Sequence, residues 1–520
     1  MSKTLLTPSD TFLYTGYRES SRLMDQTTTS EGSVYSKTIH SGKWFLIGSV
    51  LQKTIHFFGF VILARLLLPS DYGVIAIVFL VTSSIDFFLA PGFGTALLQK
   101  KHDIEHYLDT VWTFDLLKAI LIAGVILFSG GYIADFFKIS DYRTLISLSG
   151  IFVLLTAGSN RKQIYFFRDL QYKQIFLRDM VSQFAYVVCS VLWALFVEAS
   201  VMALFIGQLA RYISSFFMSY TLYPNIPRLN FHFSKLRDLF QYSKWIYAQN
   251  LINYFSNSLD KILIGRLLNS ADLGYYSRAK DIPAMFVTPI SDIFKKIGFS
   301  AFAKIQGEFD KVRLGFMKSL DIVTLVSVPM SLLFALEGGV LVETVLGGKW
   351  LLLVIPLKII AFGYIFWSVT NLVKSLFNAI GKPKIVFRLS LLQLIITPAL
   401  VYYGVTASGL KGAAVSVVIV WFMIFLYSMV VAKASLHISF TQLMPTGVTI
   451  GTASVAILVA DVLARDYVHT HFGAPLQLLW IASLALLFMI VLWIVSRAYS
   501  TGPWYTLKSV CQELGIRIPF

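Results

Sequence analysis

A succession of apolar windows of about 20 residues runs through this chain, each long enough to cross a bilayer as a helix. About fourteen windows are present, at 44–67, 73–97, 111–134, 143–160, 179–197, 200–222, 245–268, 276–300, 318–337, 351–373, 385–404, 410–432, 444–464 and 475–496. Charged residues make up 14% of the chain and hydrophobic residues 56%, more apolar surface than a water-soluble core can bury. The sequence predicts an all-α polytopic membrane protein and excludes a soluble enzyme.

The net charge of +16 has an explanation in membrane topology. Lys and Arg gather in the two tails and in alternate loops, as expected for segments on the cytoplasmic side of a membrane. This pattern predicts that the N- and C-termini are both cytoplasmic. It also accounts for the positive charge without nucleic acid as a partner.

The chain contains an internal repeat. Arg65, Asp71 and Gly73 recur with the same spacing as Arg266, Asp272 and Gly274. A repeat of six crossings returns the chain to its starting side, so we expect two parallel six-helix lobes with two extra C-terminal helices. The predicted segments are a polar cytoplasmic tail, the N-lobe, a cytoplasmic linker, the C-lobe, helices 13 and 14, and a basic cytoplasmic tail, at 1–43, 44–222, 223–244, 245–432, 433–496 and 497–520.

The repeated Arg, Asp and Gly residues favour a structural role. An Asp near the start of a helix can cap it, a Gly permits a tight turn, and an Arg can snorkel to the membrane interface.

Two polar stripes occupy the first helix of each predicted lobe. Charged groups in mid-membrane are costly and normally face protein or a wet cavity. We therefore expect both stripes to line the space between the lobes, and Arg211, in mid-window, is a candidate for contacting an anionic substrate. The candidate substrate-binding residues are Gln52, Lys53, His56, Arg211, Asn253, Asn257 and Lys261.

The acidic residues within the windows suggest other roles. Asp86, Asp260 and Asp292 are candidates for coupling to a proton or sodium gradient, with structural helix contacts as the alternative for Asp86 and Asp292. Asp115 and Lys118, three residues apart on one helix, can neutralise each other. No catalytic motif or metal site is predicted, and no cofactor is expected.

Two segments carry a family resemblance. Residues 62–101 read ILARLLLPSDYGVIAIVFLVTSSIDFFLAPGFGTALLQKK, and residues 260–280 read DKILIGRLLNSADLGYYSRAK. The first resembles the opening of the polysaccharide transporter family, the Wzx-type oligosaccharide flippases of the superfamily that includes multidrug exporters. The second resembles the start of the second lobe in that family.

This resemblance implies a substrate and a location. It implies transfer of an undecaprenyl-diphosphate-linked oligosaccharide across the bacterial cytoplasmic membrane by alternating access, for exopolysaccharide, capsule or O-antigen assembly. Polysaccharide polymerase and export machinery are candidate partners. A cation-coupled multidrug exporter of the same superfamily is the alternative, and a membrane-embedded glycan polymerase is a third reading. A chamber dominated by Lys and Arg favours the flippase, and one dominated by acidic and aromatic groups favours the drug exporter.

Overall fold

The computed structural model describes residues 48, 51–88, 92–94, 97, 104–169, 171–293, 302, 307–499 and 502–513. Each of the fourteen predicted windows overlaps a helix within these ranges. Eight of the described helices are long and apolar enough to cross a membrane. The predicted all-α membrane fold is confirmed, and the helices are consistent with fourteen crossings. The N-terminal tail at 1–43 lies outside the described residues.

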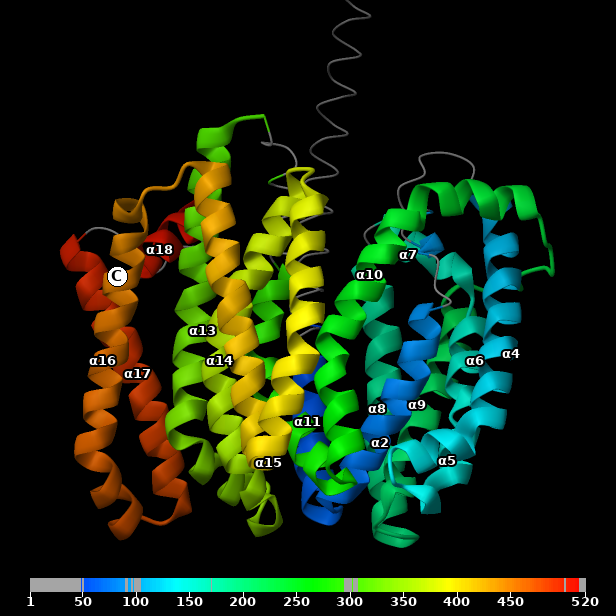
Figure 1. The fold of residues 1–520 in the computed structure, drawn as a ribbon, viewed down its shortest axis with the longest axis horizontal. Coiled ribbons are helices and arrows are strands. Elements are labelled where there is room, and N and C mark those ends of the chain that lie inside the picture. The colour runs from blue at the N-terminus through cyan, green and yellow to red at the C-terminus, as the bar shows by residue number, and fades with distance from the viewer. Residues whose placement is uncertain are drawn as a thin grey trace, which may run out of the picture.

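The first half of the chain forms one group of packed helices. A helix at 51–66 precedes the others, which are α2 (Pro69–Phe88), α4 (Glu105–Phe136), α5 (Arg143–Leu148), α6 (Gly150–Gly158), α7 (Ile164–Arg168), α8 (Tyr172–Phe196) and α9 (Val201–Leu222). Helix α8 packs along α9, and α4 packs against α5 and α6. These helices lie at one end of the long axis of the molecule (Figure 1).

The second half forms a larger group. Its helices are α10 (Phe233–Leu267), α11 (Ser270–Ile293), α13 (Phe309–Val345), α14 (Val354–Ala379), α15 (Pro383–Leu436), α16 (Phe440–His471), α17 (Ala474–Tyr499) and α18 (Pro503–Glu513). Helix α15 contains two predicted windows and is broken at Ser408 and Gly409, where Gly409 has a φ of +56°. Helix α14 packs against α13 and α15, while α16 and α17 pack beside α13.

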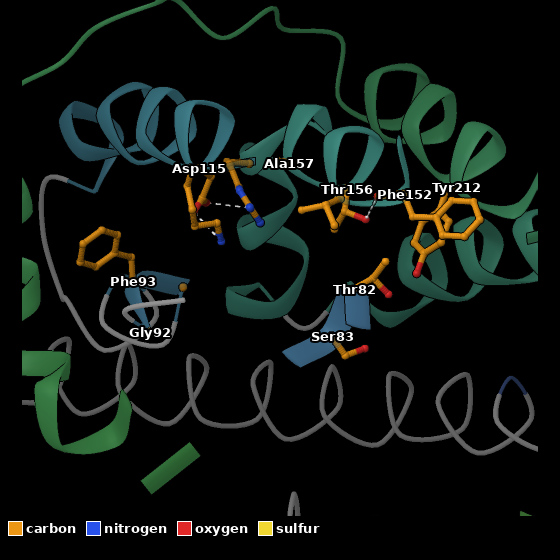
Figure 2. Close-up of a pocket in the computed structure, with 13 residues that line it drawn as sticks. Thr82, Ser83, Gly92, Phe93, Asp115, Phe152, Thr156, Ala157 and Tyr212 are labelled. Carbon is orange, nitrogen blue, oxygen red and sulfur yellow. Dashed lines mark hydrogen bonds and ion pairs between the residues drawn. The ribbon is translucent and has the colours of Figure 1, made fainter. Parts of the chain in front are cut away.

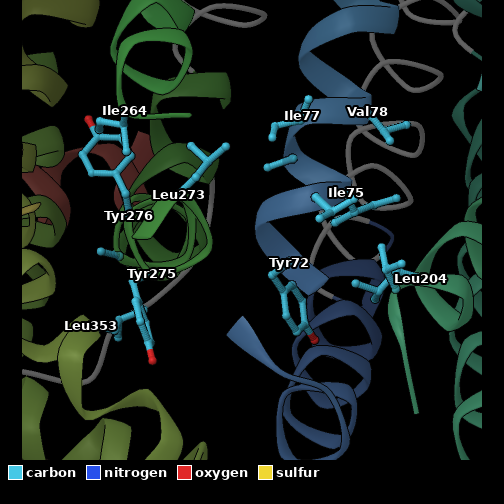
Figure 3. Close-up of a cluster of buried hydrophobic side chains, with 14 of the residues drawn as sticks. Tyr72, Ile75, Ile77, Val78, Leu204, Ile264, Leu273, Tyr275, Tyr276 and Leu353 are labelled. Atoms are coloured by element: carbon cyan, nitrogen blue, oxygen red, sulfur yellow. The ribbon is translucent and has the colours of Figure 1, made fainter. Parts of the chain in front are cut away.

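The two groups meet along α2 and α11, the corresponding helices of the repeat. Figure 3 shows Tyr72, Ile75 and Ile77 on α2 beside Leu273 and Tyr276 on α11. These side chains belong to one buried apolar cluster that draws on both halves of the chain. Burial of apolar surface therefore helps to hold the two halves together where α2 contacts α11.

The repeated glycines allow the backbones of α2 and α11 to touch. A Cβ on Gly73 would lie 1.7 Å from the carbonyl oxygen of Ser270, and one on Gly274 would lie 1.9 Å from that of Pro69. Both glycines lie within helices rather than in the turns. The expected tight turn is wrong for these glycines, because their missing side chains serve close helix contact instead.

The repeated Arg and Asp residues act at the same end of the bundle. The Asp71 carboxylate accepts a hydrogen bond of 2.8 Å from the Leu68 backbone N–H at the start of α2, as expected for a cap. Arg65, expected to snorkel, instead donates to the carbonyl oxygens of Val345 at 2.9 Å and Thr344 at 2.6 Å. Arg65 thus ties the first half of the chain to the C-terminal end of α13.

Candidate functional site

Basic side chains from both halves of the chain converge around His56 in the first helix. His56 interacts electrostatically with Lys53 on its own helix, Arg211 on α9, and Arg278 and Asp281 on α11. Lys261 on α10 interacts with both Arg278 and Asp281. We call Lys53, His56, Arg211, Lys261 and Arg278 the cationic cluster. Its two arginines remain charged, and Asp281 is the carboxylate that pairs with two of its members.

Asp281 is shared by two members of the cationic cluster. Its carboxylate lies 3.1 Å from the Arg278 guanidinium and 3.9 Å from the Lys261 ammonium. The Asp281 side chain is 39% exposed and that of Lys261 is 23% exposed. These groups are therefore accessible although they lie on membrane-spanning helices. Asp281 pairs with Lys261 and Arg278, and Arg211 lies outside these ion pairs.

Arg211 differs from the other arginine of the cationic cluster. Arg278 is engaged by Asp281 and also lies over the rings of Tyr72 and Phe60, at 5.0 Å and 5.5 Å. Arg211 is half-buried and forms neither an ion pair nor a hydrogen bond with any residue in the described part of the chain. Its five N–H donors remain available to an anion.

The polar stripe of α10 serves two different environments. Asn253 accepts a hydrogen bond of 2.6 Å from the Ser390 hydroxyl, and Asn257 accepts one of 3.4 Å from Gln393, both partners lying on α15. Asn257 is nevertheless exposed, and Lys261 follows it one turn later. Asn253 and Asn257 therefore both contact α15, while Lys261 belongs to the cationic cluster.

The other residues that the sequence suggested lie in different surroundings. Gln52 is half-buried on the first helix, one residue before Lys53. The side chains of Asp86 and Asp292 lie outside the described part of the structure. Asp260 is buried, with its carboxylate 2.5 Å from the Lys280 ammonium and 2.6 Å from the Tyr276 hydroxyl. Asp260 is thus part of a satisfied network between α10 and α11.

Loss of the Asp260 carboxylate should destabilise the fold. In the Asp260→Ala variant the Lys280 charge is left without its partner, which costs about 3 to 5 kcal/mol in comparable buried pairs. Thermal unfolding of the purified protein in detergent measures the change. Asp310→Ala is the matched control, because the Asp310 side chain is 90% exposed in its pair with Arg313 and should contribute less than about 1 kcal/mol. A normal melting temperature with lost transport would instead favour ion coupling at Asp260.

A separate polar pocket of about 360 Å³ lies within the first half of the chain, between α2, α4, α6 and α9. Figure 2 shows Asp115 pointing toward two basic groups at one side of this pocket, with Thr82 and Tyr212 further along it. Asp115 lies 3.6 Å from Lys118, as expected from their spacing, and 2.7 Å from Arg161. The Asp115 carboxylate is therefore shared by two basic side chains.

Sequence reasoning missed Arg278 and Asp281 as members of the site. Both lie in a predicted window, on the helix that is the repeat partner of α2. Their position within a membrane-spanning helix was a signal. Their proximity to His56 and Lys261 became visible only when α11 was placed beside α10 and the first helix.

The fold is shared with solved membrane transporters. A lipid II flippase, MurJ, in an inward closed conformation has a TM-score of 0.70 at 13% identity, covering 88% of this chain and 98% of MurJ. An inward-facing multidrug resistance transporter of the MATE family has a TM-score of 0.60 at 14% identity, covering 74% of this chain and 94% of that one. This chain therefore has the all-helical membrane fold of these two proteins.

Sequence comparison assigns the family. The chain belongs to the family described as polysaccharide biosynthesis protein, which matches residues 62–355, more than half of its length. It is 23% identical to the lipopolysaccharide biosynthesis protein WzxC of Escherichia coli, over 73% of this chain and 77% of WzxC. It is 25% identical to the teichuronic acid biosynthesis protein TuaB of Bacillus subtilis, over 68% of this chain and 73% of TuaB.

Proposed function

We propose that this protein is a flippase that moves undecaprenyl-diphosphate-linked oligosaccharides from the inner to the outer leaflet of the bacterial cytoplasmic membrane. The observation that supports this most directly is the cationic cluster, to which both halves of the chain contribute basic side chains. Membership of a polysaccharide biosynthesis family and relatives named for lipopolysaccharide and teichuronic acid biosynthesis agree with this substrate class.

The substrate's diphosphate explains the need for a basic site. It brings about two negative charges, and moving them into a low-dielectric bundle without partners is costly. Lys and Arg side chains offset that cost, while the polyprenyl chain remains in lipid. With the N- and C-termini in the cytoplasm, a membrane potential of about 100 mV, negative inside, favours outward movement by ~2.3 kcal/mol per charge.

Alternating access between two lobes is the proposed mechanism. The backbone contact of Gly73 with Ser270 and the Arg65 hydrogen bonds to α13 join the halves at the end where α2 begins. In the proposed orientation this is the outer end. The contacts there separate when the site opens outward and re-form after the substrate leaves.

The drug-exporter alternative predicts the opposite electrostatics. Carboxylates favour the binding of a cationic drug, whereas the cationic cluster presents basic side chains from both halves of the chain around Asp281. Repulsion between such a cluster and an organic cation opposes binding. We therefore favour an anionic substrate.

A reconstituted assay tests the proposed function. The full chain is placed in liposomes that contain a fluorescent undecaprenyl-diphosphate oligosaccharide, and a membrane-impermeant quencher reports the fraction exposed at the outside. We expect protein-dependent movement of this lipid and no movement of an undecaprenyl-linked sugar without the diphosphate. Transport of cationic dyes without movement of the diphosphate lipid would refute the proposal.

A further inference from the structure

Two buried acidic side chains lie at a contact between two helices, neither of which contributes to the cationic cluster. Glu337 lies on α13, and Asp461 lies on α16, one of the two helices outside the repeat. Each residue is only 1% exposed. The pair thus lies in the contact through which α16 and α17 join the rest of the bundle.

The two carboxyl groups lie next to each other, close enough to share a hydrogen bond when one of them is protonated. Oε1 of Glu337 and Oδ1 of Asp461 are buried and receive no hydrogen bond from a donor in the described part of the chain. A carboxylate can only accept, so a hydrogen bond between two carboxyl groups requires that one of them carries a proton. Two carboxylates in contact are also strongly disfavoured when both are ionised.

Basic groups surround the pair from two helices. On α16, His469 lies 3.1 Å from Glu337 and the Arg465 guanidinium lies 3.8 Å from it. On α14, the Lys358 ammonium donates to the Leu336 carbonyl at 2.8 Å and interacts electrostatically with both acids. Helix α17 has one charged residue, Arg497, near its other end. These groups stabilise one negative charge on the pair without a hydrogen bond to every acidic oxygen.

Two basic side chains beside the pair extend from it to the surface of the protein. Glu337 itself has no exposed side-chain surface, but His469 is 28% exposed and Arg465 is 37% exposed. An imidazole that contacts both water and a carboxyl group is suited to relaying a proton. The acidic pair is therefore buried, which favours a bound proton, and His469 gives it a contact through which that proton can be exchanged.

We propose that Glu337 and Asp461 form a proton-binding site that takes up one exchangeable proton, with His469 as the relay to water. Uptake transfers a proton from water to a carboxylate oxygen, and release returns it, so no other reactant is needed. In the protonated state the shared hydrogen bond attaches α16 to α13. Release of the proton places two negative charges in contact and weakens that attachment, which makes the packing of the α16–α17 hairpin sensitive to pH.

Infrared difference spectroscopy on the full chain in lipid nanodiscs tests this directly. Between acidic and alkaline buffer, we expect the wild type to show the C=O stretching band of a protonated carboxyl group, shifted in D₂O. The band should be lost in Glu337→Gln and in Asp461→Asn, which keep the size of each side chain. Asp466→Asn is the matched control, because Asp466 lies exposed on the same helix, and this variant should retain the band.

Proton counting provides a second measurement that needs no transport. Titration of the wild type over the same range should release one more proton per molecule than titration of Glu337→Gln. An unchanged carboxyl band in both single variants, or equal proton release in the wild type and Glu337→Gln, would overturn the proposed site. Because neither measurement involves the lipid-linked sugar, such a result leaves the proposed flippase function standing.

Discussion

The Arg211→Ala variant is expected to lose transport of the diphosphate-linked lipid by about 10- to 100-fold, because a hydrogen bond to a charged group contributes ~1.5 to 3 kcal/mol. Arg278 and Lys261 each have Asp281 as a partner, whereas Arg211 has no ion-pair partner among the described residues. Its removal therefore subtracts substrate contact without stranding a buried carboxylate. Initial rates of flipping in the liposome assay, and surface polysaccharide in cells, measure the effect.

Two further variants separate charge from geometry at Arg211. Arg211→Lys keeps the charge but loses the planar fork of donors, so we expect an intermediate rate. Lys411→Ala removes an exposed basic residue on α15 and should transport normally. All three proteins should be present in the membrane at wild-type levels. Normal flipping by well-expressed Arg211→Ala would exclude Arg211 from substrate binding.

The second large effect is expected from adding a methyl group to both glycines at the α2–α11 contact. In the Gly73→Ala/Gly274→Ala variant, each new Cβ meets a carbonyl oxygen, at 1.7 Å and 1.9 Å before any movement. Backbone atoms cannot rotate away as a side chain can, so the helices must separate. Overpacking of this kind costs about 1 to 3 kcal/mol per site, which shifts the population away from the closed arrangement by at least about tenfold.

Spin labels measure this opening. Labels at Glu198→Cys and Leu352→Cys, both exposed in the connections that follow α8 and precede α14, report the distance between the two halves at this end. Cys189 and Cys511 are first replaced by Ser. We expect a longer distance in the glycine double variant. Gly124→Ala, on a part of α4 with nothing within 4 Å of the added Cβ, should leave the distance unchanged, and an unchanged distance in the double variant would show that the contact does not control closure.

The repeat illustrates what sequence could and could not predict here. The spacing of Arg65, Asp71 and Gly73 in both halves correctly indicated a shared structural role. The cap by Asp71 followed from local chemistry, since it involves residues three positions apart. The role of Gly73 did not, because its contact is with Ser270 on the other helix of the pair. A glycine in the sequence does not reveal whether its missing side chain permits a turn or a close contact between helices.

The sequence likewise predicted some features of the candidate site and not others. Lys53, Arg211 and Lys261 were identified because a charge within an apolar window needs a reason to be there. Whether such a charge is already neutralised depends on its neighbours across helices. Asp260 looked equally available in sequence, yet the structure gives it Lys280 and Tyr276 as partners. Arg211 has no comparable partner in the part of the chain that the structure describes.

For this protein, the sequence by itself determined the membrane-spanning helical class, the repeat and the types of charged residue placed within the bilayer. These features depend on local composition and periodicity, because every backbone polar group in lipid must be satisfied within its own helix. Only the tertiary structure decided which charges meet. Asp281 joins Lys261 to Arg278, and Glu337 meets Asp461 across α13 and α16, because electrostatic partnership depends on distances between helices that no spacing along one helix specifies.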